Sequence, residues 1–326
     1  MSETKVAVVG GGYWGKNLIR VFHQLGGLSI ICDTNPALRE TYESSFKGVK
    51  FASRVEEVLN DDSISGVVIA TPAATHYEIG RKFLEAGKDL FIEKPLALTK
   101  ADGEKLVNIS EKNNCILMVG HILHYHPAVI KLKQLIKNNE LGDLQYLYSN
   151  RLNIGRIRHE ENILWSFAPH DISLMLSLAG EMPDSVNAFG RSYLPHPVED
   201  VTLTFFSFPS GITGHVFVCW LNPFKEQKFV VIGSKKMAVF DDTSRTDKLV
   251  LYHHKINWSG KEIPSIEKSD GVPIEIENYE PLLEETKHFL ECMKRRTKPI
   301  TDGQEGLRVL SVLEMAQNSL KKRGKL

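Results

Sequence analysis

The chain has 326 residues, 42% of them hydrophobic and 25% charged, a composition typical of a soluble globular protein and a length that favours two domains. Its 40 basic residues balance its 40 acidic ones, which argues against nucleic acid or an anionic membrane as a partner held by bulk electrostatics. No apolar run reaches the ~18 residues of a membrane span. The four cysteines form no CxxC pair, so we expect a reduced, cytoplasmic protein without a metal site.

The first part of the chain alternates strand and helix patterns. Near-continuous apolar runs such as Val67-Val68-Ile69 are typical of parallel strands buried on both faces. The pattern predicts an α/β domain over residues 1–121, with a doubly wound parallel sheet. Strands are expected at 5–9, 28–32, 49–51, 66–70, 89–92 and 115–119, and helices at 13–25, 36–45, 54–60, 75–86 and 100–113.

The remaining residues, 122–326, predict an α+β domain with a mainly antiparallel sheet. Segment 257–280 is rich in Pro, Gly and acidic residues and predicts a loop. The last helix could pack back onto the first domain. Strands are expected at 184–191, 199–208, 212–221, 227–233, 236–241 and 248–254, and helices at 126–139, 169–179, 281–295 and 303–322.

The strand over 212–221 is apolar on both of its faces. Val216, Val218 and Trp220 share one face, while Phe217 and Cys219 share the other. If helices cover one side of the sheet, a second subunit would cover the other. We therefore expect a homo-oligomer, a dimer or tetramer, formed through this sheet.

A glycine-rich turn follows the first strand and opens the first helix. In this context Gly10 would allow the tight turn, Gly12 the close approach of a pyrophosphate, and Gly15 the packing of helix against strand. Asp33 ends the second strand, where a carboxylate accepts hydrogen bonds from ribose hydroxyls and repels a 2′-phosphate. Because no Arg or Lys follows at once, NAD is favoured over NADP.

Two further strand ends lie at the same edge of the predicted sheet, where ligands bind in this fold. Thr71-Pro72 with His76 follows the fourth strand, and helix capping is the alternative role for this threonine. Glu93-Lys94-Pro95 follows the fifth. A surface lysine is the usual case, but burial or a cofactor cation would lower the pKa of Lys94 and let it accept a hydroxyl proton. The cofactor-binding residues expected are Gly10, Gly12, Tyr13, Trp14, Gly15, Asp33, Thr71, Pro72, His76, Glu93 and Lys94.

Two candidates lie further along the chain. Pro169 suits a first helical turn, which would place His170 at a helix start as a second proton-transfer or substrate-orienting residue; a structural histidine is the alternative. Arg156 and Arg158 share a strand face and suit an anion site, with solvated arginines as the alternative.

Taken together, these motifs resemble the glucose–fructose oxidoreductase, inositol dehydrogenase and MocA family of NAD(P)-dependent sugar dehydrogenases. The resemblance spans nearly the whole chain. It implies a Rossmann domain, a second domain with a large open sheet used for oligomerisation, and Lys94 and His170 as the catalytic pair. The matching elements are Gly10–Gly15, Asp33, Thr71-Pro72 with His76, Glu93-Lys94-Pro95, Gly120 with His126-Pro127, His170 and Ile300-Thr301-Asp302-Gly303.

The chain departs from the family pattern at two positions. Many members have Asp where this chain has Ser166, and many have Arg where it has His124. Within the family the chain is most similar to enzymes acting on nucleotide sugars, including UDP-N-acetylglucosaminuronate 3-dehydrogenases of surface-polysaccharide pathways. The substrate-binding residues expected on this basis are Lys94, His124, Tyr125, Asn153, Arg156, Arg158 and His170.

The leading hypothesis is an NAD-dependent dehydrogenase that oxidises a ring hydroxyl, such as C3 of a UDP-N-acetyl-aminosugar uronate. The same chemistry on a free sugar or a cyclitol such as inositol is the first alternative. A non-catalytic NAD-dependent sensor, suggested by Ser166, is the second.

Overall fold

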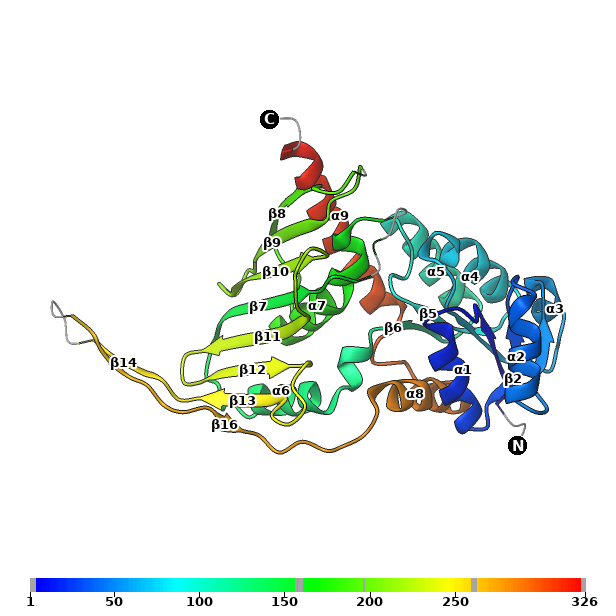
Figure 1. The fold of residues 1–326 in the computed structure, drawn as a ribbon, viewed down its shortest axis with the longest axis horizontal. Coiled ribbons are helices and arrows are strands. Elements are labelled where there is room, and N and C mark those ends of the chain that lie inside the picture. Colours follow the sequence, from blue (N-terminus) through cyan, green and yellow to red (C-terminus); the bar gives the residue numbers. More distant parts are fainter. Residues whose placement is uncertain (1–3, 156, 158–160, 196, 259–262, 324–326) are drawn as a thin grey trace. The chain divides into compact units, whose positions relative to one another are not determined.

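The computed structural model describes residues 4–155, 157, 161–195, 197–258 and 263–323. The chain forms two compact units, drawn in Figure 1. Unit 1 comprises Met1–Tyr125 and Tyr279–Ser311, and unit 2 comprises His126–Asn278 and Val312–Leu326. The chain therefore contributes two separate segments to each unit.

Unit 1 contains a six-stranded parallel sheet with the strand order β3-β2-β1-β4-β5-β6. This is the order of the doubly wound dinucleotide-binding fold, in which the first strand lies next to the point where the strand order reverses. The predicted parallel sheet is thus confirmed. The strands are β1 (Val6–Val9), β2 (Leu28–Cys32), β3 (Lys50–Ala52), β4 (Gly66–Ile69), β5 (Asp89–Glu93) and β6 (Leu117–Gly120).

Helices cover both faces of this sheet, with the pair α1 and α8 on one side and the pair α4 and α5 on the other (Figure 1). Phe289 of α8 is fully buried and meets Phe22 and Phe91 edge-to-face, with ring centroids 6.4 and 5.7 Å away. The helices are α1 (Gly15–Gln24), α2 (Ala37–Ser45), α3 (Val55–Leu59), η1 (Ala73–Thr75), α4 (His76–Glu85), α5 (Lys100–Lys112), η2 (Ile122–Tyr125) and α8 (Pro281–Arg295).

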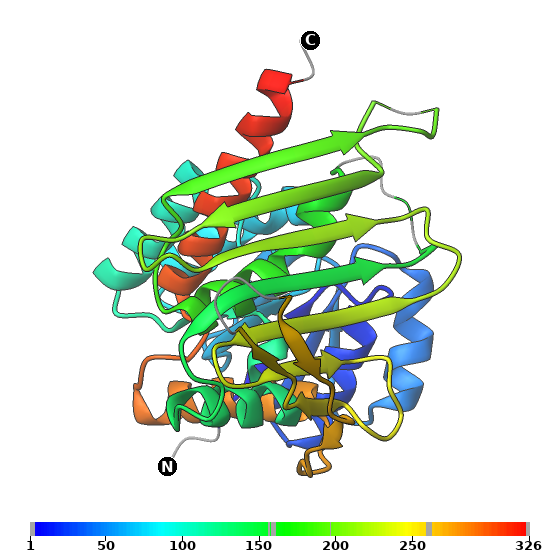
Figure 2. The ribbon, with the colours of Figure 1, turned by 90° about the vertical axis from the view of Figure 1, so that its left-hand side faces the viewer.

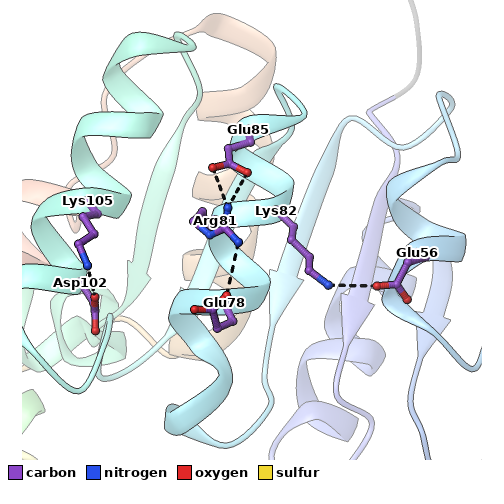
Figure 3. Close-up of polar contacts among 7 residues, drawn as sticks. All are labelled: Glu56, Glu78, Arg81, Lys82, Glu85, Asp102 and Lys105. Carbon is purple, nitrogen blue, oxygen red and sulfur yellow. Dashed lines mark hydrogen bonds and ion pairs between the residues drawn. The ribbon is translucent and has the colours of Figure 1, made fainter.

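Exposed ion pairs lie on helices α3, α4 and α5 (Figure 3). Lys82 Nζ lies 3.1 Å from Glu56 Oε1 and joins α4 to α3, and Arg81 pairs with Glu85 at 3.0 Å within α4. Solvent screens such exposed pairs, so they contribute little to stability.

Unit 2 contains an eight-stranded mixed sheet with the strand order β16-β13-β12-β11-β7-β10-β9-β8. β7 and β10 are parallel and the other neighbours are antiparallel, which confirms the mainly antiparallel sheet. The strands are β7 (Leu144–Leu152), β8 (Ser185–Arg191), β9 (Val201–Ser207), β10 (Thr213–Cys219), β11 (Glu226–Gly233), β12 (Met237–Asp241), β13 (Leu249–Tyr252) and β16 (Val272–Pro273), with β14 (Lys255–Asn257) and β15 (Ser265–Glu267) forming a separate pair.

Helix α7 (Ile163–Ala179) packs on β7 and β10 and covers one face of the sheet. Figure 2 shows the other face towards the viewer, free of helices. The remaining helices are α6 (Pro127–Lys137) in unit 2 and α9 (Gly303–Arg323), whose residues are divided between the two units after Ser311.

Three sequence expectations for unit 2 were wrong or incomplete. α7 begins six residues earlier than the expected 169–179, because the Asn162 side chain caps it by accepting from the Trp165 N–H at 3.3 Å. Pro169 therefore lies inside the helix, and His170 is not at a helix start. The central strand β7 was not expected, and the expected loop 257–280 contains β15 and β16.

Among the described residues, no helix is both long and apolar enough to cross a membrane.

Candidate functional site

The glycine-rich turn after β1 has the geometry of a dinucleotide-binding loop. Gly10 has φ of +99°, and a Cβ added there would lie 2.8 Å from the Ala70 backbone. A Cβ on Gly15 would lie 1.8 Å from the Gly10 carbonyl oxygen, so this position requires glycine. At Gly12 a Cβ would meet nothing within 4 Å, which leaves room for a phosphate group beside the start of α1. The residues present therefore fit a dinucleotide.

Asp33, at the end of β2, points its carboxylate at this turn. Its Oδ2 accepts a hydrogen bond of 2.6 Å from the Gly11 N–H, and its Oδ1 accepts one of 2.8 Å from the Asn35 N–H. These bonds hold a half-buried carboxylate next to the glycine turn, as a ribose-binding residue requires.

A contact that the sequence did not reveal joins the glycine turn to the Glu93-Lys94-Pro95 motif. Trp14 donates its indole N–H to Glu93 Oε1 at 2.5 Å, across 79 residues of chain. Glu93 is buried, and burial raises the pKa of its carboxyl, while the Trp14 hydrogen bond and the Lys94 charge act in the opposite direction. Its Oε2 accepts a bond of 3.3 Å from the Lys94 N–H. Glu93 thus ties the predicted proton acceptor to the predicted cofactor loop.

His76, at the start of α4, connects two strand ends. One ring nitrogen lies 2.7 Å from the Pro95 carbonyl oxygen, and the other lies 2.9 Å from the Thr71 carbonyl oxygen. The Thr71 hydroxyl in turn lies 2.7 Å from that of Thr75. The predicted cofactor residues Thr71 and His76 therefore lie together beside the loop that follows Lys94.

The segment after β6 brings histidines to the same edge of the sheet. His121 Nδ1 lies 2.5 Å from Glu305 Oε2, and His124 Nε2 lies 3.9 Å from Glu305 Oε1. Tyr125 is buried, which raises the pKa of its hydroxyl, and its oxygen lies 3.4 Å from the Thr301 hydroxyl. The sequence did not predict the contact between His121 and Glu305, because 184 residues separate them.

The other predicted site residues belong to unit 2. His170 lies on α7 and is half-buried, and Asn153 follows β7. The neighbouring Asp171 accepts bonds from Arg151 Nε and from the Ser149 hydroxyl, each at 2.6 Å. These bonds hold the Asp171 carboxylate against β7.

Arg156 and Arg158, the predicted anion-binding pair, lie outside the described residues. Among the described residues, no cluster of three or more His, Cys, Asp or Glu side chains could hold a metal ion.

A second buried carboxyl lies near Glu93. Glu285 of α8 is fully buried, and neither of its carboxyl oxygens has a hydrogen-bond partner among the described residues. Burial raises the pKa of Glu285 well above its ordinary value of 4.5, and the charge of Glu93 raises it further. The folded protein therefore binds this proton more tightly than the unfolded chain does, so stability is lost as the pH rises above that ordinary value.

Glu285→Gln is expected to be more stable than the parent protein, because it removes this loss. The difference should grow as the pH rises above 4.5, by up to ~1.4 kcal/mol per pH unit, until the buried carboxyl of the parent protein ionises. Urea unfolding at several pH values measures it, with Glu291→Gln on the exposed side of α8 as the matched control. A difference that stays constant with pH would contradict the protonated state.

Comparisons with known proteins agree with the fold described above and with the glycine-rich turn after β1. Residues 4–121 match the model of the oxidoreductase family with an NAD-binding Rossmann fold, and residues 129–239 match the GFO/IDH/MocA C-terminal domain. The chain is 30% identical over 195 residues to an uncharacterized oxidoreductase of Streptococcus pneumoniae, an alignment that spans 53% of that protein.

Two relatives of known activity align along most of their length. A scyllo-inositol 2-dehydrogenase (NAD(+)) of Bacillus subtilis is 27% identical over 98% of this chain and 94% of its own. A UDP-N-acetylglucosamine 3-dehydrogenase of Acidithiobacillus ferrooxidans is 22% identical over 95% of each chain. A solved structure of the latter enzyme superposes with a TM-score of 0.85 at 21% identity and covers 99% of both chains. The two family models together match most of the chain. The chain therefore belongs to the GFO/IDH/MocA family of oxidoreductases with an NAD-binding Rossmann domain.

Proposed function

We propose that this protein is an NAD-dependent dehydrogenase that oxidises a ring hydroxyl of a nucleotide sugar, such as C3 of a UDP-N-acetyl-aminosugar uronate, in surface-polysaccharide biosynthesis. The observation that carries the proposal is the Trp14–Glu93 hydrogen bond, which joins the dinucleotide loop to the strand end bearing Lys94. The likeness to a UDP-N-acetylglucosamine 3-dehydrogenase along 95% of each chain supports the substrate class.

In this proposal NAD, when bound, accepts the hydride that leaves the hydroxyl-bearing carbon. Gly10, Gly12 and Gly15 allow the pyrophosphate to approach the start of α1, and Asp33 accepts hydrogen bonds from the ribose. The remaining contacts to the cofactor come from Tyr13, Trp14, Thr71, Pro72, His76, Glu93 and Lys94.

Lys94 accepts the hydroxyl proton, which requires the neutral amine at the moment of transfer. Glu93 holds the backbone of Lys94 by accepting a hydrogen bond from the Lys94 N–H. His170 orients the substrate hydroxyl or relays its proton. The sugar and its diphosphate are bound by His124, Tyr125, Asn153, Arg156 and Arg158.

Oxidation of a free cyclitol is the second candidate. It is favoured by the likeness to a scyllo-inositol 2-dehydrogenase, which spans 98% of this chain. The two candidates differ in the need for a diphosphate-binding site, because a free cyclitol carries no phosphate.

Reduction of NAD across a panel of UDP-sugars, free sugars and inositols tests both candidates. Arg156→Ala is expected to raise the KM for a UDP-sugar by about 10- to 100-fold, because a charge-assisted hydrogen bond to phosphate is lost, and to leave inositol oxidation unchanged. If NAD binds but no compound of the panel is oxidised, the dehydrogenase proposal fails.

We also propose a cytoplasmic homo-oligomer formed through the open face of the unit 2 sheet. Phe205 and Phe189 on that face are 40% and 47% exposed, although such large side chains are usually covered.

A further inference from the structure

Strands β14 and β15 form an arm that stands away from the eight-stranded sheet. The arm continues β13 and returns into β16, and its two strands pair only with each other among the described strands. In Figure 1 it extends far beyond the sheet, and in Figure 2 it points towards the viewer from the sheet's open face. A two-stranded ribbon of this kind is marginally stable in water unless something packs against it.

The paired positions of the arm form one apolar and one polar face. Ile256 and Ile266 lie opposite each other across the two strands and are 62% and 63% exposed. Trp258 follows two residues after Ile256 and therefore lies on the same face, where it is 71% exposed. Pro264 completes this face by the same alternation.

On the opposite face of the arm the paired positions are polar, and Ile263, which is 93% exposed, follows beyond them by the same alternation. Lys255 lies opposite Glu267, and Asn257 lies opposite Ser265. Asn257 also donates a hydrogen bond of 2.7 Å to Glu267 Oε1. Over its paired positions, the arm thus exposes its isoleucines on one face only.

The open face of the sheet has the same apolar character as the arm. Tyr148 stacks on His215 with ring centroids 5.1 Å apart, and Phe205 lies 5.8 Å from the same ring. Burial lowers the pKa of His215, which favours its uncharged form. The face is therefore aromatic and carries no charge at this cluster.

The two surfaces are continuous. Val250 and Tyr252 lie on the open face, because they pair across β12 with Val239 and Met237 while Leu249 and Leu251 are buried on the helix side. Two-residue alternation from Tyr252 leads through His254, whose ring centroid lies 5.5 Å from that of Tyr252, to Ile256 and Trp258. A surface that is apolar except for His254 thus runs from the sheet onto the arm.

We propose that the arm clasps a second copy of this chain, with the apolar face of each arm packed on the partner. In a two-fold dimer each open face would lie against the other, and the two arms would be exchanged reciprocally. The arm does not form a basic surface that would bind nucleic acid or anionic lipid. Its Lys255 and Lys268 are matched by Glu267 and Asp270, and the chain as a whole has 40 basic and 40 acidic residues. The inference rests on the oligomer proposed above.

The double variant Ile256→Asp/Ile266→Asp tests the clasp. It is expected to raise the dissociation constant of the oligomer by at least ~100-fold, because it places charges where the proposed clasp would bury two isoleucines. The matched control, Asn257→Asp/Ser265→Asp, adds the same charges to the polar face and should leave the constant unchanged. Sedimentation velocity over a dilution series measures mass, and fluorescence titration with NADH shows that unit 1 is folded in every variant.

Phe217→Asp on the open face separates the clasp from the sheet interface. Dissociation by Phe217→Asp but not by the arm variant would overturn the clasp and keep the sheet interface. A wild-type protein that stays monomeric would overturn both. Binding of the wild type to phosphatidylglycerol vesicles, abolished by the arm variant while the mass is unchanged, would overturn the clasp in favour of a lipid. None of these measurements needs a substrate, so their results are independent of the dehydrogenase proposal.

Discussion

Lys94→Ala is expected to lower kcat by about 100- to 10,000-fold, the usual contribution of a positioned general base. Alanine cannot accept the hydroxyl proton, so the hydride would have to leave a neutral alcohol. Binding of NAD should largely persist, because Lys94 is one of many proposed contacts and the glycine turn and Asp33 are untouched. Single-turnover reduction of NAD by a substrate from the panel measures the loss, and NADH titration measures the cofactor affinity.

Lys100→Ala is the matched control, because Lys100 is a second lysine, six residues further on, paired with Glu104 on the surface of α5. It should leave turnover unchanged. Methylamine added to Lys94→Ala is expected to restore part of the rate, since a small amine supplies the missing base. Unaltered turnover in Lys94→Ala would exclude the lysine as the proton acceptor.

Asp33→Ala is expected to raise the dissociation constant for NAD by about 10- to 100-fold, as hydrogen bonds to a charged group are lost. The affinity for NADP should stay level or improve, because the carboxylate no longer repels the 2′-phosphate. Isothermal titration with both cofactors measures the ratio.

Asp33 also accepts bonds from the Gly11 and Asn35 N–H groups, so alanine loosens the turn itself. Asp33→Asn keeps one acceptor oxygen for the turn while removing the charge, and it should still relax the preference for NAD over NADP. Equal losses for the two cofactors in both variants would show that the residue acts only on the turn.

The parallel sheet of unit 1 was predictable because burial on both faces leaves continuous apolar runs in the sequence. Val6–Val9 and Gly66–Ile69 are buried throughout, and each is short and bounded by turn residues. The glycine turn and Asp33 were equally readable, since their role follows from their place after a strand.

The elements that the sequence did not reveal depend on long-range contacts. β7 mixes polar and apolar residues, because Ser149 and Arg151 face Asp171 in the interior rather than an apolar core. Pro169 suggested a helix start, but the cap at Asn162 determines where α7 begins. No local sequence pattern predicts the hydrogen bond between Trp14 and Glu93, which are 79 residues apart.

The chain returns to unit 1 after forming most of unit 2, and this affects how the protein folds during synthesis. α8 supplies Phe289 to the core of unit 1, and the Val119 N–H donates to the Thr301 carbonyl at 2.7 Å beside β6. A nascent chain therefore completes the dinucleotide-binding unit only after unit 2 has largely left the ribosome, whereas domains usually fold in order of synthesis. Expression of residues 1–125 alone would leave Phe22 and Phe91 without that cover, so the cofactor-binding unit is not separable by a simple truncation.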